Sequence, residues 1–196
     1  MNTVIGLVGP IASGKGTLAQ ILKELGFEYY SLSDRIREEL TSRGLPITRQ
    51  HLQNVGDELR GTYGADILAV RTTGKIDIQA ETRIVIDSIR NPAEIGYLKE
   101  HLGAKIVGVN ASPEVRYGRL VERNRGGEPI SWEEFLAMDA RETGKATDPY
   151  KIDISGCLEL ADYVVTNNGT PDDLMEGLTR FFRETRETPR RRKEGQ

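Results

Sequence analysis

Short apolar runs alternate along the chain with longer stretches in which apolar residues recur every three or four positions. The runs are rich in β-branched residues and predict five strands, at Val4–Val8, Phe27–Leu32, Ile84–Ile86, Ile106–Val109 and Tyr163–Val165. After the first strand, apolar positions at helical spacing predict a helix that ends at Gly26. This alternation predicts an α/β fold, with a mostly parallel sheet and helices on both of its faces.

Three later helix starts share one arrangement, in which a capping residue precedes a proline at the first helical position. They stand at Asn91-Pro92, Ser112-Pro113 and Thr170-Pro171. In two of them an acidic residue, Glu94 or Asp173, follows the cap by three positions and can return a hydrogen bond to it. These signals predict helices directly after the third, fourth and fifth strands.

Two stretches interrupt the alternation. Residues 33–83 contain no strand pattern, whereas most connections of this kind need only ~2–6 residues, so they predict an inserted helical region with helices over Thr48–Arg60 and Ala65–Thr72. Residues 123–150 are rich in glycine and charge around one helix, which a capping box starts at Ser131. Polar segments over a nucleotide site commonly form lids, and we interpret the second stretch as a lid. The alternative for both stretches is surface elaboration.

The composition is that of an ordinary soluble domain. With 37% hydrophobic and 29% charged residues among 196, the chain can build one core, which we assign to residues 1–187 with a basic disordered tail at 188–196. The net charge of −3 argues against a nucleic-acid partner. No stretch approaches the ~18 apolar residues of a membrane span. The single cysteine, Cys157, excludes an internal disulfide and a cysteine-built zinc site, which indicates a reducing, cytoplasmic setting.

The residues between the first strand and its helix carry the clearest chemistry. They read Gly9-Pro10-Ile11-Ala12-Ser13-Gly14-Lys15-Gly16-Thr17. Glycines let the backbone turn its N–H groups inward, the helix N-terminus adds positive potential, and the lysine can reach β- and γ-phosphates. This spacing predicts a P-loop, the alternative being a glycine-rich turn that feeds a helix. The predicted ATP-binding residues in it are Gly9, Ala12, Ser13, Gly14, Lys15, Gly16 and Thr17.

One departure from the strict P-loop is informative. Ser or Thr usually follows the lysine directly, but here Gly16 does, and Thr17 comes next. The Gly-Lys-Gly-Thr ending resembles adenylate kinase and the other nucleoside monophosphate kinases. That resemblance implies a three-layer P-loop NTPase fold, a five-stranded parallel sheet of order 2-3-1-4-5, a helical acceptor-binding insertion and a lid. It also implies ATP as the donor and Mg²⁺ held largely through water, with Thr17 and Asp87 as the protein groups beside it.

The chain also resembles the acceptor-binding side of that family, first at the end of the second strand. Asp34 and Arg37 lie one helical turn apart and match an acidic residue followed by an acceptor-binding arginine. The alternative is a surface ion pair on an amphipathic helix.

A second acceptor-side segment closes the third strand. Residues 85–92 resemble the family's Asp-Gly-Phe-Pro-Arg, with Ser88 and Ile89 in place of Gly and Phe. The resemblance implies that Asp87 orients the water shell of Mg²⁺ and that Arg90 grips the acceptor phosphate. An Asp–Arg pair that finishes a strand is the alternative.

Arginines also lead into the predicted lid. Arg116, Arg119 and Arg123 fall on one stripe of a helix, where family members use arginines to stack on the ATP base or to neutralise the moving phosphoryl group. Arg141 is a second candidate lid cation, and a solvated basic face is the alternative for each. Asn167, after the last strand, matches a loop that touches adenine in several relatives, although turn chemistry explains it equally well. The predicted catalytic set is Lys15, Asp87, Arg119, Arg123 and Arg141.

Together these features predict an enzyme that transfers the γ-phosphate of ATP to a nucleoside or deoxynucleoside monophosphate. One alternative is a dephospho-coenzyme A kinase or a similar enzyme that phosphorylates a hydroxyl group, with Asp34 as general base. Another is a nucleotide-gated ATPase or binding module without a small acceptor. Arg60 and Arg71, in the insertion, are not distinguished from surface charges. The expected partners are small nucleotides; the sequence specifies neither the acceptor's base and sugar nor an oligomeric state.

Overall fold

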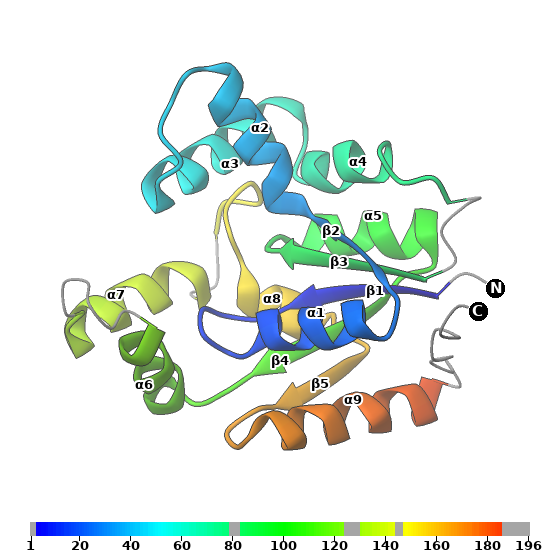
Figure 1. Ribbon diagram of the computed structural model, residues 1–196. Helices are drawn as coiled ribbons and strands as arrows, with labels where there is room; N and C mark the ends of the chain where they lie inside the picture. The colour runs from blue at the N-terminus through cyan, green and yellow to red at the C-terminus, as the bar shows by residue number, and fades with distance from the viewer. Residues whose placement is uncertain (1–2, 79–82, 124–129, 144–146, 186–196) are drawn as a thin grey trace.

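The computed structural model describes residues 3–78, 83–123, 130–143 and 147–185. In this part of the chain five parallel strands form one sheet of order β2-β3-β1-β4-β5 (Figure 1). The strands are β1 (Thr3–Val8), β2 (Glu28–Ser31), β3 (Arg83–Ile89), β4 (Lys105–Asn110) and β5 (Tyr163–Thr166). The order and direction of the strands confirm the sequence prediction.

Helices cover both faces of the sheet and give the predicted three layers. α1 (Lys15–Glu24) and α9 (Pro171–Thr185) pack on one face, and α5 (Pro92–Leu102) and α8 (Ile154–Glu159) on the other. Successive side chains of β1 alternate between the two cores, as the period of a strand requires: Val4 and Val8 join one, and Ile5 and Leu7 the other. Because both faces are buried, the strand reads as a continuous apolar run.

The sequence predicted a helical insertion with helices over Thr48–Arg60 and Ala65–Thr72, and its described residues form three helices. These are α2 (Leu32–Ser42), α3 (Arg49–Tyr63) and α4 (Ile67–Thr73), which stand together beyond β2 and β3 (Figure 1). Two of the boundaries that differ from the prediction bear on the site. Leu32 already belongs to α2, and β3 continues to Ile89, so Asp87 lies within the strand, where it is level with Ser31 of β2.

The predicted lid contains one described helix, α7 (Trp132–Thr143), which packs against α6 (Pro113–Arg123). The hydrogen bonds between Ser131 and Glu134 confirm its capping box, and a second box is confirmed at the start of α5. The predicted tail, 188–196, lies outside the described residues. Among those residues, no helix has the length and apolar character needed to cross a membrane.

Candidate active site

The phosphate loop, residues 9–15, joins β1 to α1 through unusual backbone conformations. Ala12 and Gly14 have φ angles of 58° and 101°. Gly14 caps α1 without offering a side chain to the first N–H groups of the helix, which leaves them to bind a ligand. A Cβ atom at Gly14 would stand 2.0 Å from Asn167 Nδ2, so the close approach of the two segments requires glycine.

Two side chains form hydrogen bonds to the backbone of this loop. Buried Asn167 donates from Nδ2 to the Ser13 carbonyl at 2.8 Å. Arg119 donates from Nη1 to the same carbonyl at 3.4 Å and from Nη2 to Gly169 O at 3.1 Å. The structure therefore brings both predicted residues to the loop, where their side chains brace its backbone. Ser13 Oγ is buried and has no hydrogen-bond partner in the described part of the chain, so a ligand oxygen would satisfy it.

Lys15 and Asp87, which are 72 residues apart in sequence, meet beside the loop. Lys15 Nζ donates to Asp87 Oδ1 at 2.6 Å, and the Ser88 amide donates to the same oxygen at 2.5 Å. Ser88 has a φ of 65°, a left-handed conformation at the position where the family pattern has glycine. On the other side, Tyr29 donates its hydroxyl to Asp87 Oδ2 at 3.1 Å. Partial burial, reinforced by the Asp87 charge, raises the pKa of Tyr29 to about 12, so its hydroxyl remains a donor.

The donor set around this carboxylate fits magnesium held partly through water. Within the described residues, no three His, Cys, Asp or Glu side chains are grouped as a metal site. Asp87 offers hard carboxylate oxygens beside the phosphate loop, which suit Mg²⁺ when water and nucleotide oxygens complete its shell. Thr17 is exposed on α1 and does not line the adjoining cavity.

A cavity of about 360 Å³ opens between the phosphate loop, the insertion and the lid. Besides Lys15 it is lined by arginines from α2, α3, the end of β3 and the end of α6, namely Arg37, Arg49, Arg60, Arg90 and Arg123. The sequence predicted three of these, Arg37, Arg90 and Arg123, and the structure brings them together. Such a concentration of guanidinium groups beside a phosphate loop suits a second anionic ligand.

Glu142 of α7 enters this cavity. Its Oε1 accepts hydrogen bonds from Arg49 Nη2 at 2.7 Å and from Arg90 Nη1 at 3.1 Å. Of the described residues that line the cavity, only Glu142 carries a carboxylate. The predicted lid thus contributes an acidic group that is bonded to both the insertion and the sheet.

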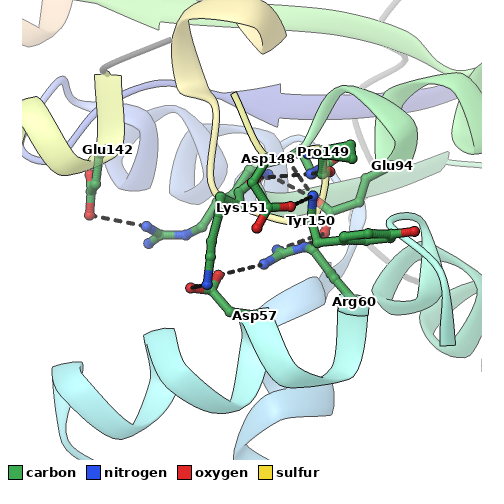
Figure 2. A network of polar contacts seen from close by, with 10 residues as sticks. Asp57, Arg60, Glu94, Glu142, Asp148, Pro149, Tyr150 and Lys151 are labelled. Atoms are coloured by element: carbon green, nitrogen blue, oxygen red, sulfur yellow. Dashed lines mark hydrogen bonds and ion pairs between the residues drawn. The ribbon is translucent and has the colours of Figure 1, made fainter. Parts of the chain in front are cut away.

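Arg60, which also lines the cavity, forms a different kind of pair (Figure 2). It is buried and donates to Glu94 Oε1 from Nε at 2.9 Å and from Nη2 at 2.8 Å. Glu94 Oε2 accepts from the amides of Arg90 and Asn91, which fixes the start of α5. Because its guanidinium is committed to a fully buried carboxylate, Arg60 joins α3 to the core and positions Arg90.

The other predicted residues lie outside the cavity lining. Asp34 is half-exposed and accepts from Arg37 Nη1 at 3.3 Å, and Arg141 is exposed on α7. Arg71 stacks over the Tyr63 ring. Arg116, from the helical stripe, is buried and donates to both oxygens of Asp139, at 2.5 and 2.8 Å, which fixes α6 against α7.

The sequence did not identify Arg49, Glu142 or Tyr29. Arg49 follows the cap of α3, and Glu142 is one position from Arg141, but neither neighbour distinguishes them from surface charges. Tyr29 lies in a predicted strand, and only the pairing of that strand with β3 reveals its contact with Asp87.

A family model described as an AAA domain matches residues 5–138. The chain is 34% identical over 180 residues to a UPF0200 protein of Pyrococcus horikoshii, which covers 89% of this chain and 93% of that protein. The structure is similar to that of TT1252 from Thermus thermophilus (TM-score 0.59, 21% identity, 93% of this chain and 97% of that one). It is also similar to shikimate kinase from Bacteroides thetaiotaomicron (TM-score 0.55, 17% identity, 94% and 98%).

These similarities give the chain a P-loop kinase-like fold, which confirms the coarse form of the resemblance. Neither the family description nor the relatives' names narrow it to nucleoside monophosphate kinases.

Proposed function

We propose that this chain, which belongs to the AAA-domain family and to the UPF0200 proteins, is an ATP-dependent phosphotransferase whose acceptor is a nucleoside or deoxynucleoside monophosphate. The observation that supports this most strongly is the shared cavity, in which the phosphate loop forms one wall and arginines from the insertion, the sheet and α6 form the others. A donor polyphosphate and an acceptor phosphate would therefore meet in one cavity.

The donor is held by Lys15 and by backbone N–H groups of Ala12–Gly16. Asp87, together with water and nucleotide oxygens, would hold Mg²⁺, which would neutralise charge on the phosphates. Lys15 lies beside both the loop and Asp87, so its charge is placed where negative charge accumulates during transfer. Arg123 lines the same cavity. It is the lid-side cation that would take the part of the catalytic arginines of nucleoside monophosphate kinases.

The acceptor is a phosphate in this proposal because the cavity is lined by cations and offers no free carboxylate among its described residues to act as a general base. The single carboxylate among its described lining residues, Glu142, is bonded to two arginines, and Asp34 lies outside the lining. A hydroxyl acceptor needs a positioned base to take its proton, whereas a phosphate oxygen is already ionised at neutral pH. Arg37 and Arg90 are the acceptor-binding residues that this arrangement favours.

The test is a measurement of ADP formation from ATP and Mg²⁺ with a panel of acceptors. The panel contains ribo- and deoxynucleoside monophosphates, and dephospho-coenzyme A as a hydroxyl acceptor. At least one monophosphate should accelerate ADP release and yield a nucleoside diphosphate, identified by phosphorus NMR. Acceleration by dephospho-coenzyme A alone would establish the hydroxyl-phosphorylating alternative, and an acceptor-independent rate would indicate an ATPase module. If calorimetry detects no binding of ATP with Mg²⁺, the donor assignment is wrong as well.

A further inference from the structure

The acceptor end of the cavity already holds an anionic group of the protein itself. The Glu142 side chain is 5% exposed, and Arg49 and Arg90 converge on its Oε1 from α3 and from the residue after β3. Two guanidinium groups around one oxygen form an arrangement that binds a phosphate as readily as a carboxylate. Figure 2 shows Glu142 pointing from the end of α7 toward the polar network that joins Asp57 and Arg60 of α3 to Glu94 and residues 148–151.

This contact differs from the buried pair nearby. In the Arg60–Glu94 pair the side chains are 2% and 0% exposed, so neither partner can exchange for a ligand. Arg49 and Arg90, by contrast, are 41% and 33% exposed and line the cavity. Their guanidinium groups are accessible from the space in which an acceptor would lie, and only Glu142 would have to leave.

We propose, on the basis of the phosphotransferase function above, that Arg49 and Arg90 form the binding site for the acceptor phosphate and that Glu142 occupies this site until the phosphate displaces it. A phosphate group near −2 with three acceptor oxygens is a stronger partner for two arginines than a carboxylate of charge −1. Phosphate and the Glu142 carboxylate cannot both bind the two arginines, because two negative charges held that close together repel strongly in a partly buried cavity. A singly charged anion binds the two arginines little better than the Glu142 carboxylate does, so it does not displace Glu142. The site therefore selects dianions.

Displacement of Glu142 also moves the end of α7. The segment that follows it, residues 148–151, is anchored independently: Lys151 pairs with Asp57 at 3.0 Å, and Asn91 Nδ2 donates to the carbonyls of Pro149 and Lys151. The anchored segment stays with the insertion while the last turn of α7 is released. Acceptor binding is thereby coupled to the position of the lid helix.

The test compares Glu142→Gln, which keeps the side-chain shape and removes its charge, with Glu133→Gln, an exposed position on the same helix. Calorimetry measures binding of inorganic phosphate and of the nucleoside monophosphates. Glu142→Gln should tighten binding of these ligands by about tenfold and change ATP affinity less than about twofold. Glu133→Gln should change neither. Arg49→Gln should weaken phosphate binding by about tenfold.

The outcomes separate this inference from the proposed function. If Glu142→Gln binds phosphate no more tightly than the wild type, the displacement is wrong even if nucleoside monophosphates are good acceptors. If inorganic phosphate follows the expected pattern but no monophosphate binds or reacts, the anion site stands and the proposed acceptor is wrong. Should Glu142→Gln fail to fold, unchanged phosphate affinity in Arg49→Gln overturns the site.

Discussion

The donor and acceptor sides of the cavity are built in different ways. The proposed donor side is a run of neighbouring residues, 9–16, that presents backbone N–H groups and a helix start to the cavity. The acceptor side is assembled from side chains of α2, α3, β3, α6 and α7, which are distant in sequence. A site made of backbone depends on local conformation and tolerates little change, whereas a site made of converging side chains can be altered one contact at a time. We therefore expect large effects on the donor side and graded effects on the acceptor side.

The largest effect is expected for Lys15→Met. The substitution removes the cation that lies 2.6 Å from Asp87 beside the phosphate loop. Without that charge on the transferred phosphoryl group, kcat/KM should fall about 10³-fold, or about 4 kcal/mol of transition-state stabilisation. Steady-state ADP formation measures it, with Lys105→Met, exposed at the start of β4, as the matched control. A loss below tenfold would show that the donor side does not depend on this charge.

Gly14→Ala tests whether the loop backbone is as constrained as the comparison requires. The new Cβ would meet Asn167 Nδ2 at 2.0 Å, in a backbone with a φ of 101°. Strain and steric overlap together should lower the free energy of unfolding by about 3 kcal/mol, measured by urea denaturation. Gly16→Ala is the control, because no atom lies within 4 Å of its Cβ position, and its stability should be unchanged or slightly higher. Equal stability of the two variants would contradict the constraint.

These two positions also show why the donor side was predictable. A phosphate loop and the helix that follows it are contiguous, so spacing alone identifies them. The contact between Arg49 and Glu142 joins residues 93 apart and depends on how α7 lies against α3, which no local pattern encodes. The arginine stripe of α6 illustrates the same limit. Its helical spacing was right, yet neighbouring elements decide that Arg116 is buried against Asp139, that Arg119 braces the loop and that Arg123 reaches the cavity.

Arg37→Ala should produce the graded effect expected of the acceptor side. Arg37 lines the cavity but is 45% exposed, so its loss removes one of several cations around the acceptor phosphate. The acceptor KM should rise about tenfold while the KM for ATP stays within about twofold. Arg43→Ala, at the residue that follows α2 and is bonded to Glu58 at 2.8 Å, serves as the control and should alter neither constant. An equal loss of affinity for ATP would count against an acceptor-side role.

The smallest effect is expected for Tyr29→Phe, which removes the hydroxyl that donates to Asp87 Oδ2 at 3.1 Å. Asp87 keeps its bonds to Lys15 and to the Ser88 amide, so kcat/KM should fall about twofold, roughly 0.5 kcal/mol, with exposed Tyr150→Phe as the control.

The pH dependence sharpens this test of Tyr29. Partial burial, together with the Asp87 charge, raises the pKa of Tyr29 from 10.0 to about 12, so the folded protein retains this proton where the unfolded chain loses it. The contribution of Tyr29 to stability is therefore complete below pH 10 and is lost as the pH rises toward 12. Denaturation between pH 9 and pH 11.5 should show a steeper loss of stability in the wild type than in Tyr29→Phe. A tenfold loss of kcat/KM in Tyr29→Phe at neutral pH would instead mean that the position of the Asp87 side chain depends on β2. The donor side would then also depend on contacts between residues distant in sequence.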